Sequence, residues 1–110
     1  MSNNLKFYIN GQWVDPTTSE TLDVINPATE QSIGQIAMGG QADVDNAVAA
    51  AKAAFDSFAA TTREERVALL EKIIAKFQER MGDIASAISE EMGAPLPLAN
   101  KAQAPAGLGH

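Results

Sequence analysis

The sequence predicts an α+β chain with two amino-terminal β-strand pairs followed by three to four helices. Three observations lead to this fold class. β-rich runs alternate with turn residues over about residues 6–38, the apolar spacing becomes helical from about residue 41, and capping signals recur from there towards residue 110. No repeat or long linker interrupts the chain, so we expect residues 1–110 to lie in one domain.

The first strand pair is expected at residues 6–9 and 12–14. These runs are separated by Asn10-Gly11, a dipeptide that readily takes positive φ and therefore favours a two-residue hairpin turn. A second pair is expected at residues 22–25 and 32–36. Between its strands, Asn26-Pro27 begins an Asx-type turn in which proline presets φ.

The first helix is expected shortly after Gly39-Gly40. Asp43 falls in its first turn, where a negative charge suits the positive end of the helix dipole. Alanines at positions 47, 49, 50, 53 and 54 raise helix propensity and would allow close approach of a neighbouring element. Because apolar residues recur at spacings of four, three and four, we expect one buried stripe made of Val44, Val48, Ala51 and Phe55.

The second helix opens with a predicted capping box. The Thr61 hydroxyl is expected to accept from the Glu64 amide, while the Glu64 carboxylate reaches back to the start of the helix. Basic residues and glutamates interleave along this helix, so we expect a solvated face rather than a phosphate-binding patch. The expected apolar face consists of Val67, Leu69, Leu70, Ile73, Ile74, Phe77 and Met81.

Two further helical segments are expected after residue 81. Gly82-Asp83 is predicted to end the second helix and to cap a third, which Gly93 stops. A final helix can start at residues 95–98, and Pro105 is expected to kink or end it. The inward face of the third helix is expected to hold Ile84, Ala85, Ile88 and Met92.

Composition excludes several classes of function. The net charge of −6 argues against nucleic acid or an anionic membrane surface as the main partner. No apolar run approaches the roughly 18 residues of a membrane span, and the first residues lack the features of a signal peptide, so we expect a cytoplasmic protein. Without cysteine, the chain has no disulfide, thiolate metal site or cysteine nucleophile of its own.

The search for self-contained chemistry finds no catalytic and no cofactor-binding candidate. His110, the one histidine, is the last residue. Glu90 and Glu91 are adjacent on a helix and point about 100° apart, which makes a poor acid–base pair. Gly39-Gly40 lacks the spacing of a glycine-rich phosphate loop.

Several motifs in one order resemble a known family. Residues 7–13 (FYINGQW), 24–29 (VINPAT), 33–34 (IG), 43–48 (DVDNAV) and 90–95 (EEMGAP) look like the amino-terminal segment of NAD(P)-dependent aldehyde dehydrogenases. The similarity covers roughly residues 6–110, with Ala94 where the family often has lysine. It implies that residues 1–110 are the amino-terminal part of a Rossmann-like α/β cofactor domain.

The resemblance also implies what this chain lacks. Members of the family use a cysteine nucleophile and a glutamate base, and NAD or NADP accepts the hydride. Those residues are expected beyond His110, so we expect this chain alone to be inactive and to bind no dinucleotide. Its expected partners are the rest of the subunit or homologous subunits, because helix stripes built to cover another element leave apolar faces that favour self-association or a homo-oligomer.

One site of the family falls within the chain. Many members have a monovalent-cation site made of backbone carbonyls before the Asn-Pro turn and a carboxylate before the glycine turn. The resemblance assigns the carbonyls to Val24 and Ile25 and the carboxylate to Glu91. Oxygen ligands suit a hard cation.

Two other classes remain open. The first is a stand-alone acidic helical module that docks a partner, which independent folding would favour. The second is a truncated, non-catalytic subunit that joins the oligomer of a full-length homologue, which co-purification with that homologue would favour.

Overall fold

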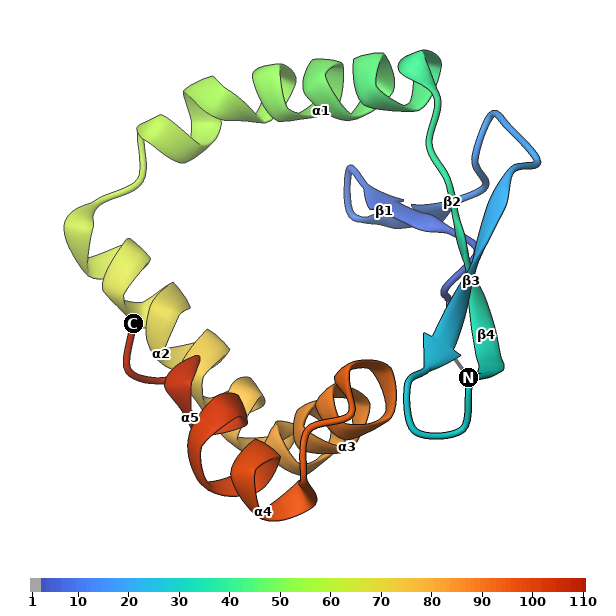
Figure 1. Cartoon of the computed structure of the whole chain (residues 1–110). Helices are drawn as coiled ribbons and strands as arrows, with labels where there is room; N and C mark the ends of the chain where they lie inside the picture. Colours follow the sequence, from blue (N-terminus) through green and yellow to red (C-terminus); the bar gives the residue numbers. More distant parts are fainter. Residues whose placement is uncertain (1–2) are drawn as a thin grey trace. The chain divides into compact units, whose positions relative to one another are not determined.

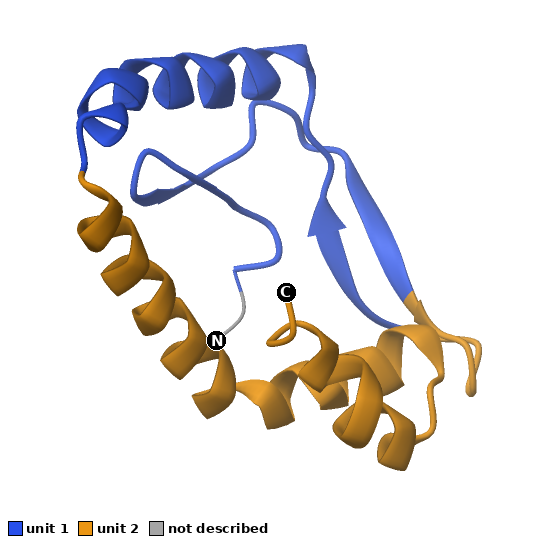
Figure 2. Cartoon of the chain, turned by 90° about the vertical axis from the view of Figure 1, so that its left-hand side faces the viewer, with its two compact units in different colours: residues 1–24, 32–61 blue, residues 25–31, 62–110 orange. Residues whose placement is uncertain are grey.

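The computed structural model describes residues 3–110, which form two compact units (Figures 1 and 2). The first unit comprises the described residues up to 24 together with residues 32–61, and the second comprises residues 25–31 and 62–110. Four strands precede the helices, which confirms the predicted fold class. The strands are β1 (Phe7–Ile9), β2 (Gln12–Val14), β3 (Thr21–Asn26) and β4 (Gln31–Ala37).

Three long helices and a short helical run follow the strands. The long helices are α1 (Gln41–Ala59), α2 (Arg63–Glu79) and α3 (Met81–Met92). The run consists of α4 (Leu96–Leu98), a π-helical turn η1 (Ala99–Gln103) and α5 (Ala104–Ala106). None of the described helices has the length and apolar character needed to cross a membrane.

The first hairpin forms at the predicted turn. Strands β1 and β2 are antiparallel, and Asn10 and Gly11 take φ of 53° and 75°, as a two-residue type I′ turn requires. Tyr8 pairs with Trp13 across the ladder, and their ring centroids lie 5.2 Å apart at an interplanar angle of 60°. The register is therefore fixed by turn chemistry and supported by an aromatic pair.

The second strand pair, β3 and β4, is joined by the predicted Asx-type turn. The side-chain oxygen of Asn26 accepts from the Ala28 amide at 2.8 Å, and the Asn26 carbonyl accepts from the Glu30 amide, also at 2.8 Å. Glu30 takes a φ of 58°, which completes the reversal before β4 begins. Both strand pairs are thus set by short-range polar contacts.

Helix α1 presents its alanine face to the first hairpin. Ala47 and Ala50 are half-buried on this face, because small side chains let a helix approach strands closely. The stripe predicted to be buried is instead exposed, at 54% for Val44, 52% for Val48 and 68% for Phe55. The stripe is therefore not buried within this unit, whose described residues use the neighbouring face of the helix, and its exposure agrees with the apolar faces expected of a stripe that covers another element. The groove between hairpin and helix is lined by Tyr8, Ile9, Asn10, Gly11, Ala47, Ala50, Ala51 and Ala54.

Helix α2 begins with a capping box one residue later than predicted. The Thr62 hydroxyl accepts from the Glu65 amide at 3.1 Å, and the Glu65 carboxylate accepts from the Thr62 amide at 2.7 Å. The Thr61 hydroxyl instead donates to the Phe58 carbonyl at the end of α1, at 2.6 Å. The sequence contains two overlapping boxes, and the first is unused because Thr61 belongs to the end of the preceding helix.

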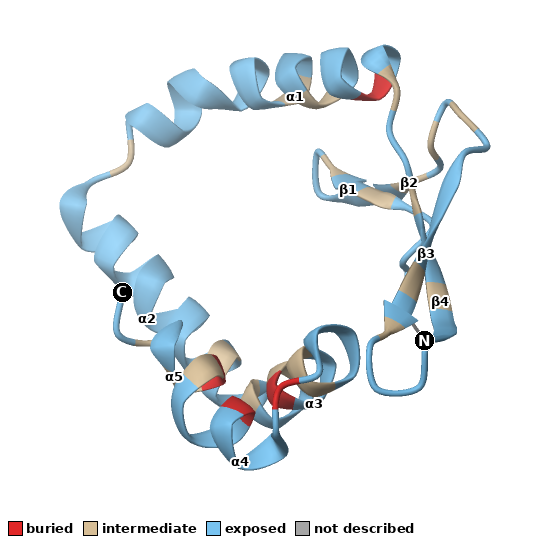
Figure 3. Cartoon of the chain, viewed as in Figure 1, coloured by how far each residue is buried: buried red, intermediate tan, exposed pale blue. Residues whose placement is uncertain are grey.

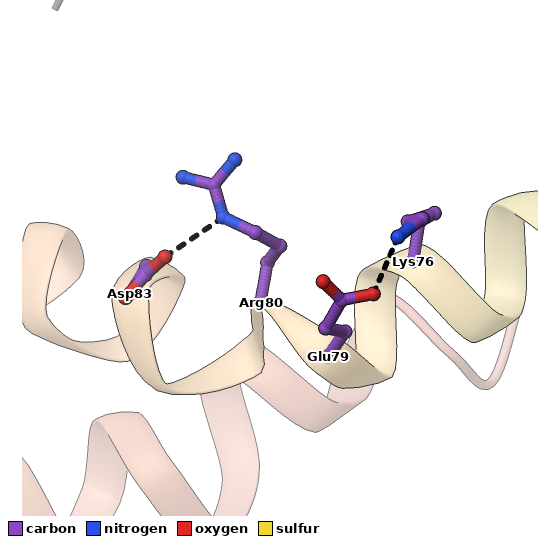
Figure 4. Close-up of polar contacts among 4 residues, drawn as sticks. All are labelled: Lys76, Glu79, Arg80 and Asp83. Carbon is purple, nitrogen blue, oxygen red and sulfur yellow. Dashed lines mark hydrogen bonds and ion pairs between the residues drawn. The ribbon is translucent and has the colours of Figure 1, made fainter. Parts of the chain in front are cut away.

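The boundary between α2 and α3 lies at Arg80, two residues before the predicted break at Gly82. Gly82 is therefore inside the first turn of α3 and does not end α2. Two exposed ion pairs flank the boundary, joining Lys76 to Glu79 at 2.6 Å and Arg80 to Asp83 at 2.8 Å (Figure 4). Exposed pairs of this kind contribute little to stability.

Small residues form the core of the second unit. The buried positions of this unit lie on α3, on the connection after it and on the helical run that follows (Figure 3). Met81, Ile84 and Ile88 pack against this cluster, whereas Met92, predicted to face inward, is 64% exposed. The cluster consists of Ala85, Ala94, Ala99 and Ala104.

The final helical run is irregular before Pro105 and ends one residue after it, at Ala106, in line with the expectation that this proline kinks or ends the helix. The π-helical turn precedes the proline, whose missing N–H removes one helical hydrogen bond. A Cβ placed on Gly107 would lie 2.5 Å from the tip of the Phe77 ring, so the end of the run lies against α2. This contact makes Phe77 half-buried.

The remaining apolar face of α2 stays exposed among the described residues. Leu70 is 58% exposed and Ile73 53%, and no α2 residue reaches the buried class. Because burial of large apolar side chains stabilises a fold, such a face would be stabilised by a surface that removes it from water.

Candidate functional site

The expected cation ligands lie at the ends of two elements. Ile25 is near the end of β3 and Glu91 is near the end of α3, and both belong to the second unit. Both side chains are exposed. Val24 is the preceding residue of β3 and belongs to the first unit.

A close contact brings the two turns of the second unit together. Gly93 ends α3 in the left-handed conformation, with φ of 75°. A Cβ built on Gly93 would lie 2.9 Å from Cγ of Pro27. Ile25 precedes Pro27 by two residues and Glu91 precedes Gly93 by two, so this contact places the end of β3 beside the end of α3.

The chemistry of the candidate ligands suits an alkali-metal or alkaline-earth cation rather than a transition metal. Backbone carbonyls and a carboxylate are hard oxygen donors. Within residues 3–110, no three His, Cys, Asp or Glu side chains gather into a metal-binding cluster. Ile25 and Glu91 would therefore supply part of a coordination shell, completed by other oxygen ligands.

Asp43 is the one buried charged residue among those described, with 7% of its surface exposed. Its carboxylate accepts from the Gly40 amide, the Thr17 amide and the Thr17 hydroxyl, each at 2.9 Å. The Gly40 and Thr17 amides, more than the hydroxyl, hold the pKa of Asp43 below its ordinary value against the opposing effect of burial.

Sequence reasoning placed Asp43 in the first turn of α1 but did not find its link to Thr17. The two residues are 26 positions apart, and no local pattern joins them. Asp43 therefore fastens the segment before β3 to the helix, which is a structural role.

The glycine pair before α1 serves packing. A Cβ on Gly39 would lie 3.3 Å from the Phe7 ring, and one on Gly40 would lie 3.0 Å from the Thr18 methyl carbon. The Gly40 amide is occupied by Asp43. A carboxylate at this helix start disfavours a phosphate there.

Comparison with known proteins matches the aldehyde dehydrogenase family model to residues 13–108. A 3-succinoylsemialdehyde-pyridine dehydrogenase from a Pseudomonas species is 51% identical over 106 residues, which are 96% of this chain and 22% of that protein. The chain spans 22 to 23% of the length of the first curated relatives that it matches.

Solved structures give the same result. An aldehyde dehydrogenase from Bartonella henselae has a TM-score of 0.96 at 44% identity, covering 100% of this chain and 23% of that one. Aldehyde dehydrogenase C of Pseudomonas syringae, solved with NAD+ and octanal, has a TM-score of 0.92 at 43% identity, covering 94% of this chain and 21% of that one. From the match over residues 13–108, this chain belongs to the aldehyde dehydrogenase family and corresponds to the amino-terminal part of its members.

Proposed function

We propose that this chain is the amino-terminal part of a subunit that oxidises an aldehyde to a carboxylic acid with NAD or NADP. The family match over residues 13–108 carries this proposal. The chain has no cysteine, so the nucleophilic thiol comes from the rest of the subunit. NAD or NADP, bound elsewhere in the subunit, supplies the hydride acceptor.

The role proposed for the chain itself is to cover other parts of the enzyme. Its large apolar side chains are exposed on α1 and α2, while its buried apolar core is made of alanines. Such faces are stabilised when another surface removes them from water. The rest of the subunit or a homologous subunit is the proposed surface, in a cytoplasmic homo-oligomer.

A monovalent cation is proposed to bind at the carbonyls of Val24 and Ile25 and the carboxylate of Glu91. The contact of Pro27 with Gly93 supports the pairing of Ile25 with Glu91. In this site the chain would hold the end of β3 against the end of α3, and the cation would neutralise the Glu91 charge. The cation would therefore stabilise the structure and would take no part in the reaction of the aldehyde.

The central test compares the whole subunit with the 110-residue chain. We expect the subunit, expressed from the complete reading frame, to form NADH or NADPH from an aldehyde, and the 110-residue chain to form none. Sedimentation should show the isolated chain as self-associating. Activity of the isolated chain would contradict the proposal, and so would a whole subunit that oxidises no aldehyde in a panel of aliphatic and aromatic aldehydes.

Replacing exposed apolar residues provides a sharper version of the same test. Val48→Gln and Leu70→Gln together should reduce self-association of the 110-residue chain and weaken folding of the whole subunit, because both side chains are half or more exposed in the chain. Lys52→Gln and Lys72→Gln are matched controls on the same helices. If the two pairs behave alike, the apolar faces are not covering surfaces.

A further inference from the structure

The tip of the first hairpin combines an exposed asparagine with an unhindered neighbouring amide. Asn10 and Gly11 are both exposed, and nothing lies within 4 Å of the place where a Cβ on Gly11 would be. Within residues 3–110, neither the Asn10 side chain nor the Gly11 amide has a hydrogen-bond partner. The side-chain amide and the backbone nitrogen that follows it are both unoccupied.

We propose that Asn10 is a site of spontaneous deamidation in this chain. The Gly11 nitrogen attacks Cγ of Asn10, a nitrogen–carbon bond forms, and the bond from Cγ to Nδ2 breaks. Ammonia leaves and carries the proton lost by the Gly11 amide, so a five-membered succinimide remains. Water then adds to one of the two ring carbonyls and opens the ring to aspartate or to isoaspartate.

Ring closure requires the tip to leave its left-handed turn for a moment. Strands β1 and β2 have three residues each, and hairpins of this size are marginal on their own. Loop tips of such hairpins open locally far more easily than the rest of a fold. Asn-Gly is favoured in this turn, and the same position at an easily opened hairpin tip makes Asn10 susceptible to deamidation.

The second hairpin turn provides an internal comparison. Asn26 is followed by Pro27, which has no amide hydrogen and cannot close the ring. The Asn26 side-chain oxygen is also held by the Ala28 amide at 2.8 Å. Asn46 lies inside α1, where the next amide belongs to the helical hydrogen-bond ladder. Of these three asparagines, only Asn10 has both a free side chain and a following amide that is free to attack it.

The two products differ in what they do to the hairpin. Aspartate keeps the backbone unchanged and is accepted in the same turn type, so it adds only a negative charge. Isoaspartate inserts an additional carbon into the main chain, which a two-residue turn cannot absorb. The pairing of Tyr8 with Trp13 would then be lost.

Trypsin makes the test simple because cleavage after Lys6 and Lys52 leaves residues 7–52 as one peptide with Asn10, Asn26 and Asn46. The 110-residue chain is aged in mildly alkaline buffer, with and without urea, and the peptide is sequenced by mass spectrometry. Isoaspartate is labelled with isoaspartyl methyltransferase. We expect conversion at Asn10 in buffer while Asn26 and Asn46 remain intact.

Trp13 is the one tryptophan of the chain, so its fluorescence reports on the hairpin. We expect a change in that fluorescence in proportion to isoaspartate, and none in an Asn10→Asp variant before ageing. Conversion of Asn10 in urea but not in buffer would overturn the proposal. Equal conversion of Asn46 in buffer would overturn it as well.

Discussion

The Asp43 carboxylate accepts hydrogen bonds from both the amide and the hydroxyl of Thr17, each at 2.9 Å. The same carboxylate accepts from the Gly40 amide at the start of α1. One side chain thus caps a helix and fastens a distant loop to it, and both functions depend on its negative charge.

Asp43→Asn should loosen the segment around Thr17 and the start of α1, because an amide presents one acceptor oxygen where the carboxylate presents two. We expect faster hydrogen exchange at the Thr17 and Gly40 amides in the whole subunit and a lower midpoint of unfolding. Asp45→Asn is the matched control, since Asp45 is exposed and accepts only from the Gln41 side chain among the described residues. Equal effects of the two substitutions would show that Asp43 is not a special anchor.

The pKa of Asp43 also predicts a dependence on pH. The hydrogen bonds from Gly40 and Thr17 lower the pKa below its ordinary value of 3.8. The Asp43 carboxyl therefore binds its proton less readily in the folded state than in the unfolded state. The contribution of the ionised Asp43 to the free energy of unfolding is complete above about pH 4. This contribution should decrease as the pH drops through the lowered pKa of Asp43. The difference in urea midpoint between wild type and Asp43→Asn should shrink on acidification, and a constant difference would contradict the assignment.

The tight turns were predictable from neighbouring residues in the sequence, and the contacts between distant segments were not. Asn10-Gly11 and Gly93 take positive φ as their residue types indicate. The Asp43–Thr17 link and the contact of Pro27 with Gly93 join segments with no shared local pattern. Val48 lies on the predicted apolar stripe but is exposed in this chain, because an apolar spacing predicts a face suited to burial and does not name the surface that covers it.

The capping box of α2 gives a prediction that separates two adjacent threonines. Thr62→Ala should destabilise the fold by about 1 kcal/mol, because its hydroxyl caps the Glu65 amide. Thr61→Ala should cost less, since the Thr61 hydroxyl donates to a carbonyl at the end of α1 rather than capping α2. Urea unfolding of the whole subunit would measure both. A larger loss of unfolding free energy for Thr61→Ala than for Thr62→Ala would support the capping box predicted from the sequence.

Two glycines with the same backbone conformation should respond differently to alanine. Gly11 and Gly93 both have φ of 75°, so a Cβ costs about 1 to 2 kcal/mol of backbone strain at either position. At Gly11 the new methyl group meets open space, whereas at Gly93 it would lie 2.9 Å from Cγ of Pro27. Gly93→Ala must therefore also push the two turns apart and should destabilise the subunit more than Gly11→Ala. Because those turns follow the ends of β3 and α3, which carry Ile25 and Glu91, Gly93→Ala should further weaken any stabilisation of the subunit by added potassium or sodium ions, while Gly11→Ala should leave it unchanged. If Gly93→Ala and Gly11→Ala lose equal stability and neither changes the dependence on the cation, the contact of Gly93 with Pro27 does not position Ile25 and Glu91.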